Sequence, residues 1–185
     1  MTTTGPGQSA LLLLDAVSLL TSDGIDYAVI GALAASVHGV VRASIDADAV
    51  LSINTPRLRQ LEKRFADAGY EVQLREGDFD DPVPAVLVIT DSHGNRVDFL
   101  GGVRGLEAAA FSRSITVTFQ GRSLRVIGLE DLIAMKIFAG APKDLNDAGA
   151  AIQVAGDALD LDLLRRLAKG YGRTTAETLE KMLKA

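Results

Sequence analysis

The order of two hydrophobic periodicities along the chain constrains its fold most strongly. Up to residue 127, short strand-like runs alternate with helix-like stretches, and from Gly128 onward every pattern is helical. This order predicts the α/β (α+β) class: a mixed β-sheet with flanking helices and a C-terminal helical subdomain. We expect a flexible N-terminus over residues 1–9, an α/β core over residues 10–127 and the helical subdomain over residues 128–185.

The expected strands are apolar runs bounded by glycine or turn residues. They are Tyr27–Ile30, Ile45–Ile53, Tyr70–Leu74, Ala85–Thr90, Arg96–Leu100, Ile115–Phe119 and Leu124–Ile127. Apolar residues at helical spacing mark the expected helices. These are Ala10–Leu20, Ala32–His38, Pro56–Ala68, a turn at Leu106–Phe111, and then Leu129–Phe138, Lys143–Val154, Leu161–Lys169 and Thr174–Leu183.

The composition excludes several kinds of site. The chain has no cysteine, so disulfides, thiolate metal sites and cysteine nucleophiles are ruled out. The formal net charge of −5 argues against a protein that coats nucleic acid, although a local basic groove stays compatible with it. The Leu11–Leu14 run follows no basic segment and is broken by Asp15, which is typical of neither a signal peptide nor a membrane span. We expect a cytoplasmic protein without a membrane partner.

Two aspartates interrupt the strand predicted over Ile45–Ile53. Side chains alternate along a strand, so Asp46 and Asp48 should point to one face. Two carboxylates on one face repel each other and are costly to bury, and a divalent cation removes that cost. Mg²⁺ prefers hard oxygen ligands and is often held by one or two carboxylates together with substrate phosphates. The alternative is a solvent-facing edge strand whose polar residues are aspartates.

Two further features favour the metal site. Asp98 lies in another strand-like run, and three carboxylates on neighbouring strands could form a two-metal platform. Upstream, Ile30-Gly31-Ala32 passes from a strand into a helix, where free backbone N–H groups and small residues suit a phosphate. A phosphate cradle beside three carboxylates is typical of metal-assisted phosphoryl or nucleotidyl transfer.

The longer pattern resembles a known superfamily. The segment Val29–Ile53, VIGALAASVHGVVRASIDADAVLSI, is similar to the strand, small-residue turn, helix and Arg-x-Thr-x-Asp-x-Asp run of nucleotidyltransferases with the polymerase-beta-like fold. The later segment GLEDLIAMKIFAGAPKDLNDAGAAI resembles the lysine helix and basic-Asp-x-x-Asp run of the AbiEii-type toxin branch and related uncharacterised proteins. Ser44 stands for the usual threonine and Ala32 for Ser or Gly, and an arginine is missing near Ala141.

The resemblance implies roles for individual residues. Asp46 and Asp48 would bind Mg²⁺ (or Mn²⁺) on an NTP, and Asp98 would hold a second metal or act as general base. The remaining candidates for nucleotide or phosphate binding are Gly31, Ala32, Arg42, Ser44, Lys136, Lys143, Asp144 and Asp147. Arg42 could instead pair with a nearby carboxylate. Asp144 and Asp147 could instead be first-turn acids that favour a helix dipole.

Three functions stay open at this point. The first is an Mg²⁺-dependent enzyme that transfers a nucleoside monophosphate from an NTP to an RNA such as tRNA, a protein or a small molecule. Such an enzyme could be the toxin of a toxin–antitoxin system, with a cognate antitoxin as partner. The second is a degenerate module that binds a nucleotide or a protein without turnover, which the changes at Ala32 and near Ala141 favour. The third is an antibiotic nucleotidyltransferase.

Overall fold

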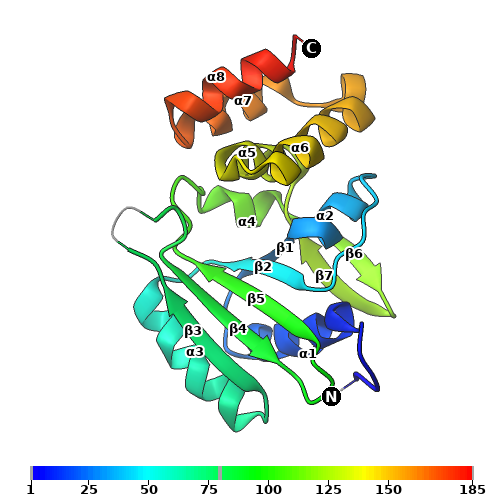
Figure 1. Ribbon diagram of the computed structural model, residues 1–185, viewed down its shortest axis with the longest axis vertical. Helices are drawn as coiled ribbons and strands as arrows, with labels where there is room; N and C mark the ends of the chain where they lie inside the picture. The colour runs from blue at the N-terminus through cyan, green and yellow to red at the C-terminus, as the bar shows by residue number, and fades with distance from the viewer. Residues whose placement is uncertain (1, 79–80, 185) are drawn as a thin grey trace.

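A seven-stranded mixed sheet forms the centre of the molecule. The computed structural model describes residues 2–78 and 81–184. The strands are β1 (Tyr27–Ile30), β2 (Ala47–Leu51), β3 (Glu71–Glu76), β4 (Ala85–Thr90), β5 (Arg96–Gly101), β6 (Ile115–Phe119) and β7 (Arg122–Val126), in the order β3-β4-β5-β2-β1-β7-β6. The predicted mixed sheet with flanking helices is confirmed (Figure 1).

The central strands bring distant parts of the sequence together. Strand β2 pairs antiparallel with β1 on one side and parallel with β5 on the other. Strand β1 also pairs parallel with β7, whereas β3-β4, β4-β5 and β6-β7 are antiparallel pairs. The predicted aspartate strand is therefore the middle strand of the sheet, and the edge-strand alternative does not apply to it.

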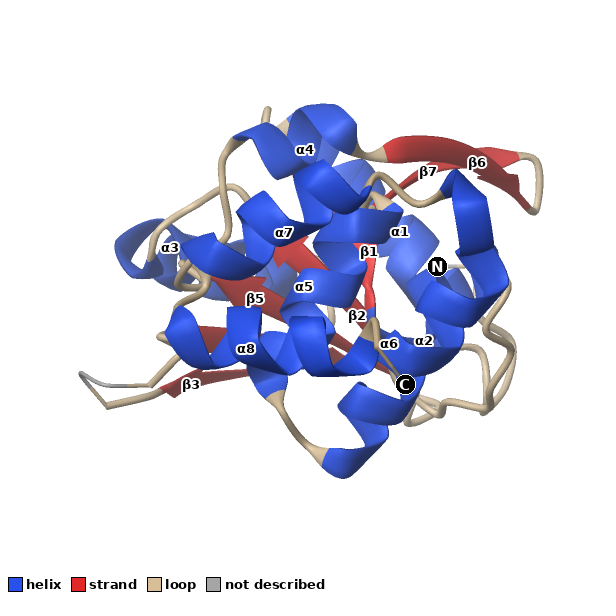
Figure 2. Ribbon diagram, turned by 90° about the horizontal axis from the view of Figure 1, so that it is seen from above, coloured by secondary structure: helices blue, strands red, loops and turns tan. Residues whose placement is uncertain are grey.

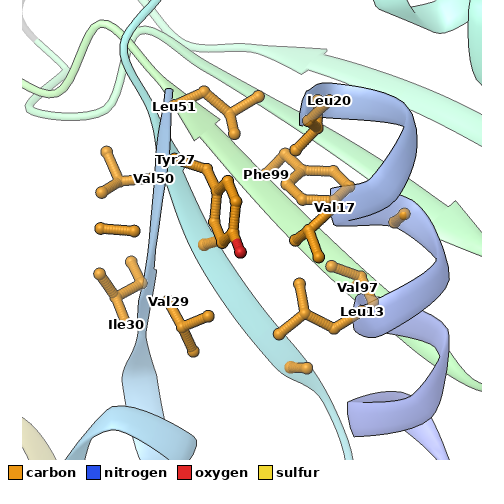
Figure 3. Packing of buried hydrophobic residues seen from close by; sticks show 14 of the residues in the cluster. Leu13, Val17, Leu20, Tyr27, Val29, Ile30, Val50, Leu51, Val97 and Phe99 are labelled. Atoms are coloured by element: carbon orange, nitrogen blue, oxygen red, sulfur yellow. The ribbon is translucent and has the colours of Figure 1, made fainter. Parts of the chain in front are cut away.

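Helices cover both faces of the sheet (Figure 1). Helix α1 (Ser9–Ser22) packs on β2 and β5, and α3 (Thr55–Asp67) packs on β3 and β4. Figure 3 shows Leu13, Val17 and Leu20 of α1 facing Val29, Val97 and Phe99 of the sheet, while Ile30 and Val50 lie on the opposite side of the strands. The opposite face carries α2 (Gly31–Val37), which contacts β1 and β2.

The C-terminal helices have a hydrophobic core of their own. Helices α5 (Leu129–Ala139), α6 (Pro142–Ala155), α7 (Leu161–Gly170) and α8 (Arg173–Met182) pack together above the sheet (Figures 1 and 2). The short helix α4 (Ala109–Arg113) follows β5 in the chain and is joined to α5 by an ion pair. Arg113 at its end donates to both oxygens of buried Asp131 at 2.7 Å, which fixes α5 against α4.

Most predicted element boundaries lie within a few residues of the observed ones. The exception that matters is the aspartate strand, expected from Ile45, which begins at Ala47. The helical turn predicted at Leu106–Phe111 is observed as a short helix that is shifted to Ala109–Arg113. His38 Nε2 donates a hydrogen bond to the Ile127 carbonyl oxygen at 2.8 Å and so joins the end of α2 to the segment that leads into α5. Among the helices of the described residues, none has the length and apolarity needed to cross a membrane.

Candidate active site

Two aspartates lie directly opposite each other in the middle of the sheet. Asp48 of β2 and Asp98 of β5 are register partners in a parallel pair, so their side chains leave the same face. Asp48 is also the register partner of Ile30, the last residue of β1. That face is the one below α5 and α6, because the other face packs on α1 (Figures 1 and 3).

Asp46 lies outside the strand. Because β2 starts at Ala47, strand alternation does not place the Asp46 side chain beside that of Asp48. Asp48 lines the larger cavity of this face, whereas Asp46 lines a separate hollow of about 150 Å³ together with Ala32 and Ser44. The predicted convergence of the acids on one face is therefore seen for Asp48 and Asp98, with Asp46 at the margin.

The turn from β1 into α2 runs against the Asp48 carboxylate. Gly31 has φ +66°, and a Cβ built on it would lie 2.1 Å from Asp48 Oδ2. Only glycine therefore fits at this position, both for its backbone conformation and for the space available. The predicted phosphate cradle and the aspartate strand are in contact, although they are separated by a helix and a loop in the sequence.

The surroundings of Asp48 disfavour the charged form of its carboxyl group. Burial raises its pKa above the ordinary value, and the negative charges of Asp98 and Asp46 raise it further. Lys136 and Arg42 act in the opposite direction from a greater distance than a hydrogen bond. Neither Asp46 nor Asp48 has a carboxylate hydrogen bond or ion pair with any residue that the structure describes. Among the described residues, no positively charged side chain therefore pairs with the Asp46 or Asp48 carboxylate.

Asp98, in contrast, has a cation of its own. Arg96 lies two residues earlier on β5 and therefore on the same face. Its Nε donates to Asp98 Oδ1 at 2.6 Å and its Nη2 donates to Oδ2 at 2.7 Å. The pKa of the Arg96 guanidinium is raised by these hydrogen bonds and by the charges of Asp98, Asp46 and Asp48. Arg96 therefore supplies the positive charge that pairs with Asp98.

A second charge cluster joins the helices to the loop before β2. Lys136 of α5 is buried and its Nζ lies 2.6 Å from Asp144 Oδ1 and 2.9 Å from Asp147 Oδ2. Arg42 Nε lies 3.0 Å from the same Asp147 oxygen. Lys136, Arg42, Asp144 and Asp147, all predicted to contact nucleotide, are brought together by the fold, and in this structure they pair with one another.

The larger cavity lies between these two charge groups. Its volume is about 440 Å³, within the range of small-molecule sites. One end is polar and is formed by Gly31, Arg42, Asp48, Lys136, Lys143 and Asp144. Lys143 is exposed at this end and forms no ion pair or hydrogen bond within residues 2–78 and 81–184. Lys143 is therefore the cation most available to an anionic ligand.

The acids suit a hard divalent cation in part. Asp46 and Asp48 offer carboxylate oxygens that no close cation compensates, which matches the needs of Mg²⁺ with bound phosphates. Across the described residues, however, no three His, Asp or Glu side chains are arranged to hold one metal ion. Both Asp98 oxygens are bound to Arg96, and Asp46 lines a separate hollow from Asp48. Asp48 is thus the carboxylate of the cavity that is open to a cation, and participation of Asp98 requires Arg96 to release it.

The sequence as a whole matches a described protein family. A sequence profile described as "Nucleotidyltransferase of unknown function (DUF6036)" matches residues 10–183. The chain belongs to this family. The DUF6036 match spans both the sheet and the C-terminal helices, so the nucleotidyltransferase assignment made from the resemblance is confirmed at this level. The AbiEii-type branch stays a prediction. No curated protein matches the chain.

Solved structures confirm the fold of this DUF6036 member. The solution structure of the antibiotic-resistance factor ANT(2″)-Ia has a TM-score of 0.60 and 15% identity, covering 96% of this chain and 97% of that one. A putative nucleotidyltransferase from Thermotoga maritima has a TM-score of 0.57 and 14% identity, covering 82% and 97%. An antigenic nucleotidyltransferase-like protein from Paracoccidioides brasiliensis has a TM-score of 0.52 and 15% identity, covering 99% and 95%.

Sequence reasoning missed two components of the site. Arg96 is not among the predicted site residues, although the Arg-x-Asp spacing on a strand places both side chains on one face. The apolar half of the cavity was also missed. Its residues lie in loops after β3 and β5 and on one side of α5, and no shared sequence pattern marks them. The ion pairs of Lys136 with Asp144 and Asp147 are not predicted from the sequence either, because they depend on how α5 and α6 pack against each other.

Proposed function

We propose that the protein transfers a nucleoside monophosphate from an NTP to a hydroxyl-bearing acceptor. One observation carries this proposal: Asp48 and Asp98 face each other on adjacent strands, with the Gly31 turn in contact with Asp48. Nucleotidyl transfer needs carboxylates beside a turn that accepts phosphate, and this arrangement supplies both. Membership of a nucleotidyltransferase family supports the same reaction.

Separate residues would bind the metal ion and the phosphates. Asp46 and Asp48 would hold Mg²⁺ or Mn²⁺, which when bound neutralises phosphate charge and polarises the reacting phosphorus. The backbone at Gly31 and Ala32 would receive phosphate oxygens, with Ser44 at the margin beside Asp46. Lys143 would contact the outer phosphates, because its ammonium group is unpaired among the described residues.

Asp98 would act on the acceptor. In the transfer, the acceptor oxygen forms a bond to the α-phosphorus, and the bond from that phosphorus to the bridging oxygen breaks, releasing pyrophosphate. The hydroxyl proton passes to a carboxylate, and Asp98 is the candidate as general base. Both of its oxygens accept hydrogen bonds from Arg96, so this role requires Arg96 to turn away.

The nature of the acceptor is a further part of the proposal. Two similar structures are antibiotic nucleotidyltransferases, ANT(2″)-Ia with adenylyl-2″-tobramycin and a lincosamide adenylyltransferase with lincomycin. They support a small-molecule acceptor ahead of RNA or protein. A toxin role with a cognate antitoxin rests on the AbiEii resemblance alone.

A second candidate is a module that binds nucleotide without turnover. It is favoured by Arg96, which occupies both Asp98 oxygens, and by Ala32, which offers no hydroxyl to a phosphate. In this case Asp46 and Asp48 would still hold a cation and its nucleotide, while Asp98 would stay paired.

Thermal denaturation with nucleotides tests both candidates. A ligand that binds the folded state raises its stability by about 2.7 kcal/mol at a hundred times its Kd. We expect each active NTP with Mg²⁺ to raise Tm, and Asp48→Asn to abolish that rise. Release of pyrophosphate from the same mixtures separates the enzyme from the binding module. An unchanged Tm with all four NTPs, or an unchanged rise in both Asp46→Asn and Asp48→Asn, would contradict the proposal.

A further inference from the structure

The cavity beside Asp48 has two chemically different halves. The polar half contains the charged residues and the Gly31 turn. The other half is a wall formed by Pro82, Val83, Val103, Met135 and Phe138. We call these five residues the apolar wall. They come from the loop before β4, the loop after β5 and helix α5, so three separate segments contribute to one surface.

The cavity that carries the apolar wall also extends over strand β5. Leu100 lines the same cavity and lies two residues after Asp98 on β5, so both side chains leave the same face of the sheet. A molecule placed on the wall would therefore lie on the face of β5 that carries Asp98, the candidate base, which itself stands outside the cavity lining. The phosphates would occupy the polar part of the cavity, near Gly31 and Lys143.

The charges of the cavity are unsuited to a polycation. Its described acidic residues are Asp48 and Asp144, and Lys136 already binds the Asp144 carboxylate at 2.6 Å. An aminoglycoside such as tobramycin carries several ammonium groups, and each loses its hydration on binding unless a carboxylate replaces it. The described residues of the wall offer none.

The wall offers little side-chain hydrogen bonding to a nucleobase. The described lining residues include no Ser, Thr, Asn, Gln, Tyr or His, so no uncharged polar side chain could pair with a base edge. A buried donor or acceptor left without a partner costs about 1–3 kcal/mol. Burial of an apolar group gains about 25 cal/mol per Å² instead.

We propose that the apolar wall is the acceptor subsite and that it selects an uncharged molecule with an apolar body and a hydroxyl group. This inference rests on the proposed function, since it names the acceptor class of that reaction. Met135 and Phe138 supply the adaptable part of the surface, because a thioether side chain and an aromatic ring fit varied apolar shapes.

Binding of the uncharged fluorescent probe N-phenyl-1-naphthylamine to the full chain tests the inference. We expect fluorescence enhancement that Val103→Glu weakens at least tenfold. Val154→Glu is the matched control, because Val154 is 58% exposed on α6 and is not part of the cavity wall. Val103→Thr keeps the shape and serves if the glutamate variant does not fold. It should weaken binding by a smaller factor.

Competition of other ligands with the probe shows which half of the cavity the probe occupies. We expect Mg²⁺ with the α,β-methylene analogue of ATP to leave the probe bound, and tobramycin to leave it bound as well. Displacement by the analogue would place the nucleobase on the wall, and displacement by tobramycin would show a polycation site; either result overturns the inference. So does absent probe binding, or equal binding by Val103→Glu. If the analogue fails to raise Tm while the probe binds, the proposed function fails instead, and with it the acceptor role.

Discussion

The backbone of Gly31 lies against the carboxylate of Asp48, and a Cβ at residue 31 would come within 2.1 Å of Oδ2. This contact joins the turn that leaves β1 to the middle strand of the sheet.

Replacement of Gly31 by alanine should be more damaging than its backbone conformation explains. The left-handed conformation alone costs a non-glycine residue about 1–2 kcal/mol. Gly24 is the matched control, because it has the same φ of +66° and no atom within 4 Å of a built Cβ. We expect Gly24→Ala to lose about 1–2 kcal/mol and Gly31→Ala to lose more, together with nucleotide binding. Chemical denaturation measures both. Equal losses would argue against the close contact.

Asp48 should destabilise the ligand-free protein at neutral pH. Its pKa is raised in the folded state, so the folded chain binds the proton more tightly than the unfolded chain does. Stability is therefore favoured below the ordinary carboxyl pKa and falls as pH rises through the raised folded value. Asp48→Asn should raise Tm at pH 7, and this gain should shrink as the pH is lowered toward 4. Melting curves across pH test this, and a lower Tm for Asp48→Asn at pH 7 would contradict it.

Asp98 should behave in the opposite way to its register partner. Its carboxylate accepts two hydrogen bonds from Arg96, at 2.6 and 2.7 Å. Hydrogen bonds to charged groups contribute about 1.5–3 kcal/mol each, and solvent screening reduces that for a half-buried pair. We expect Asp98→Asn to lower stability by about 1–2 kcal/mol at pH 7. Urea denaturation of Asp48→Asn and Asp98→Asn side by side would show this contrast.

Arg96 should weaken the binding of divalent cations. Its guanidinium occupies Asp98 and also feels the charges of Asp46 and Asp48. Arg96→Gln should therefore tighten Mn²⁺ binding by about tenfold, equivalent to about 1.4 kcal/mol. Isothermal titration with Mn²⁺ measures it, with Arg75→Gln on edge strand β3 as the control. An unchanged affinity in Arg96→Gln would show that the cation and Arg96 do not compete.

The two lysines of the cavity should separate stability from ligand binding. Lys136 is buried between Asp144 and Asp147, and removal of one partner from such a group costs about 3–5 kcal/mol. Lys143 is exposed, so Lys143→Met should change stability by about 0.5 kcal/mol or less. We expect Lys143→Met to weaken NTP binding about tenfold, as loss of one charge-assisted contact implies. Full NTP affinity in Lys143→Met would remove this residue from the site.

The sequence predicts the sheet and its acids well, because both depend on local patterns. Alternation along β5 places Asp98 on a defined face, and the parallel β2-β5 pairing makes it the neighbour of Asp48. The same rule fails for Asp46, since the chain bends before Ala47 and the strand starts later than its apolar pattern suggests.

The pairing of the charges could not be predicted from the same patterns. Arg42 and Asp147 are 105 residues apart, and their 3.0 Å contact depends on how the helices sit above the sheet. This contact agrees with the alternative in which Arg42 pairs with a nearby carboxylate. Asp144 lies in the first turn of α6, as the helix-dipole alternative expects, whereas Asp147 lies beyond that turn; both also pair with Lys136. Their roles toward nucleotide stay predictions.

The apolar wall and the acids are built on different parts of the fold. Asp48 and Asp98 belong to paired central strands, where a change of register would disturb the whole sheet. Pro82, Val83 and Val103 lie in connecting loops, which tolerate substitution far better. Mutations in the loops can therefore diversify what such a protein accepts over evolution while the strand chemistry is inherited unchanged.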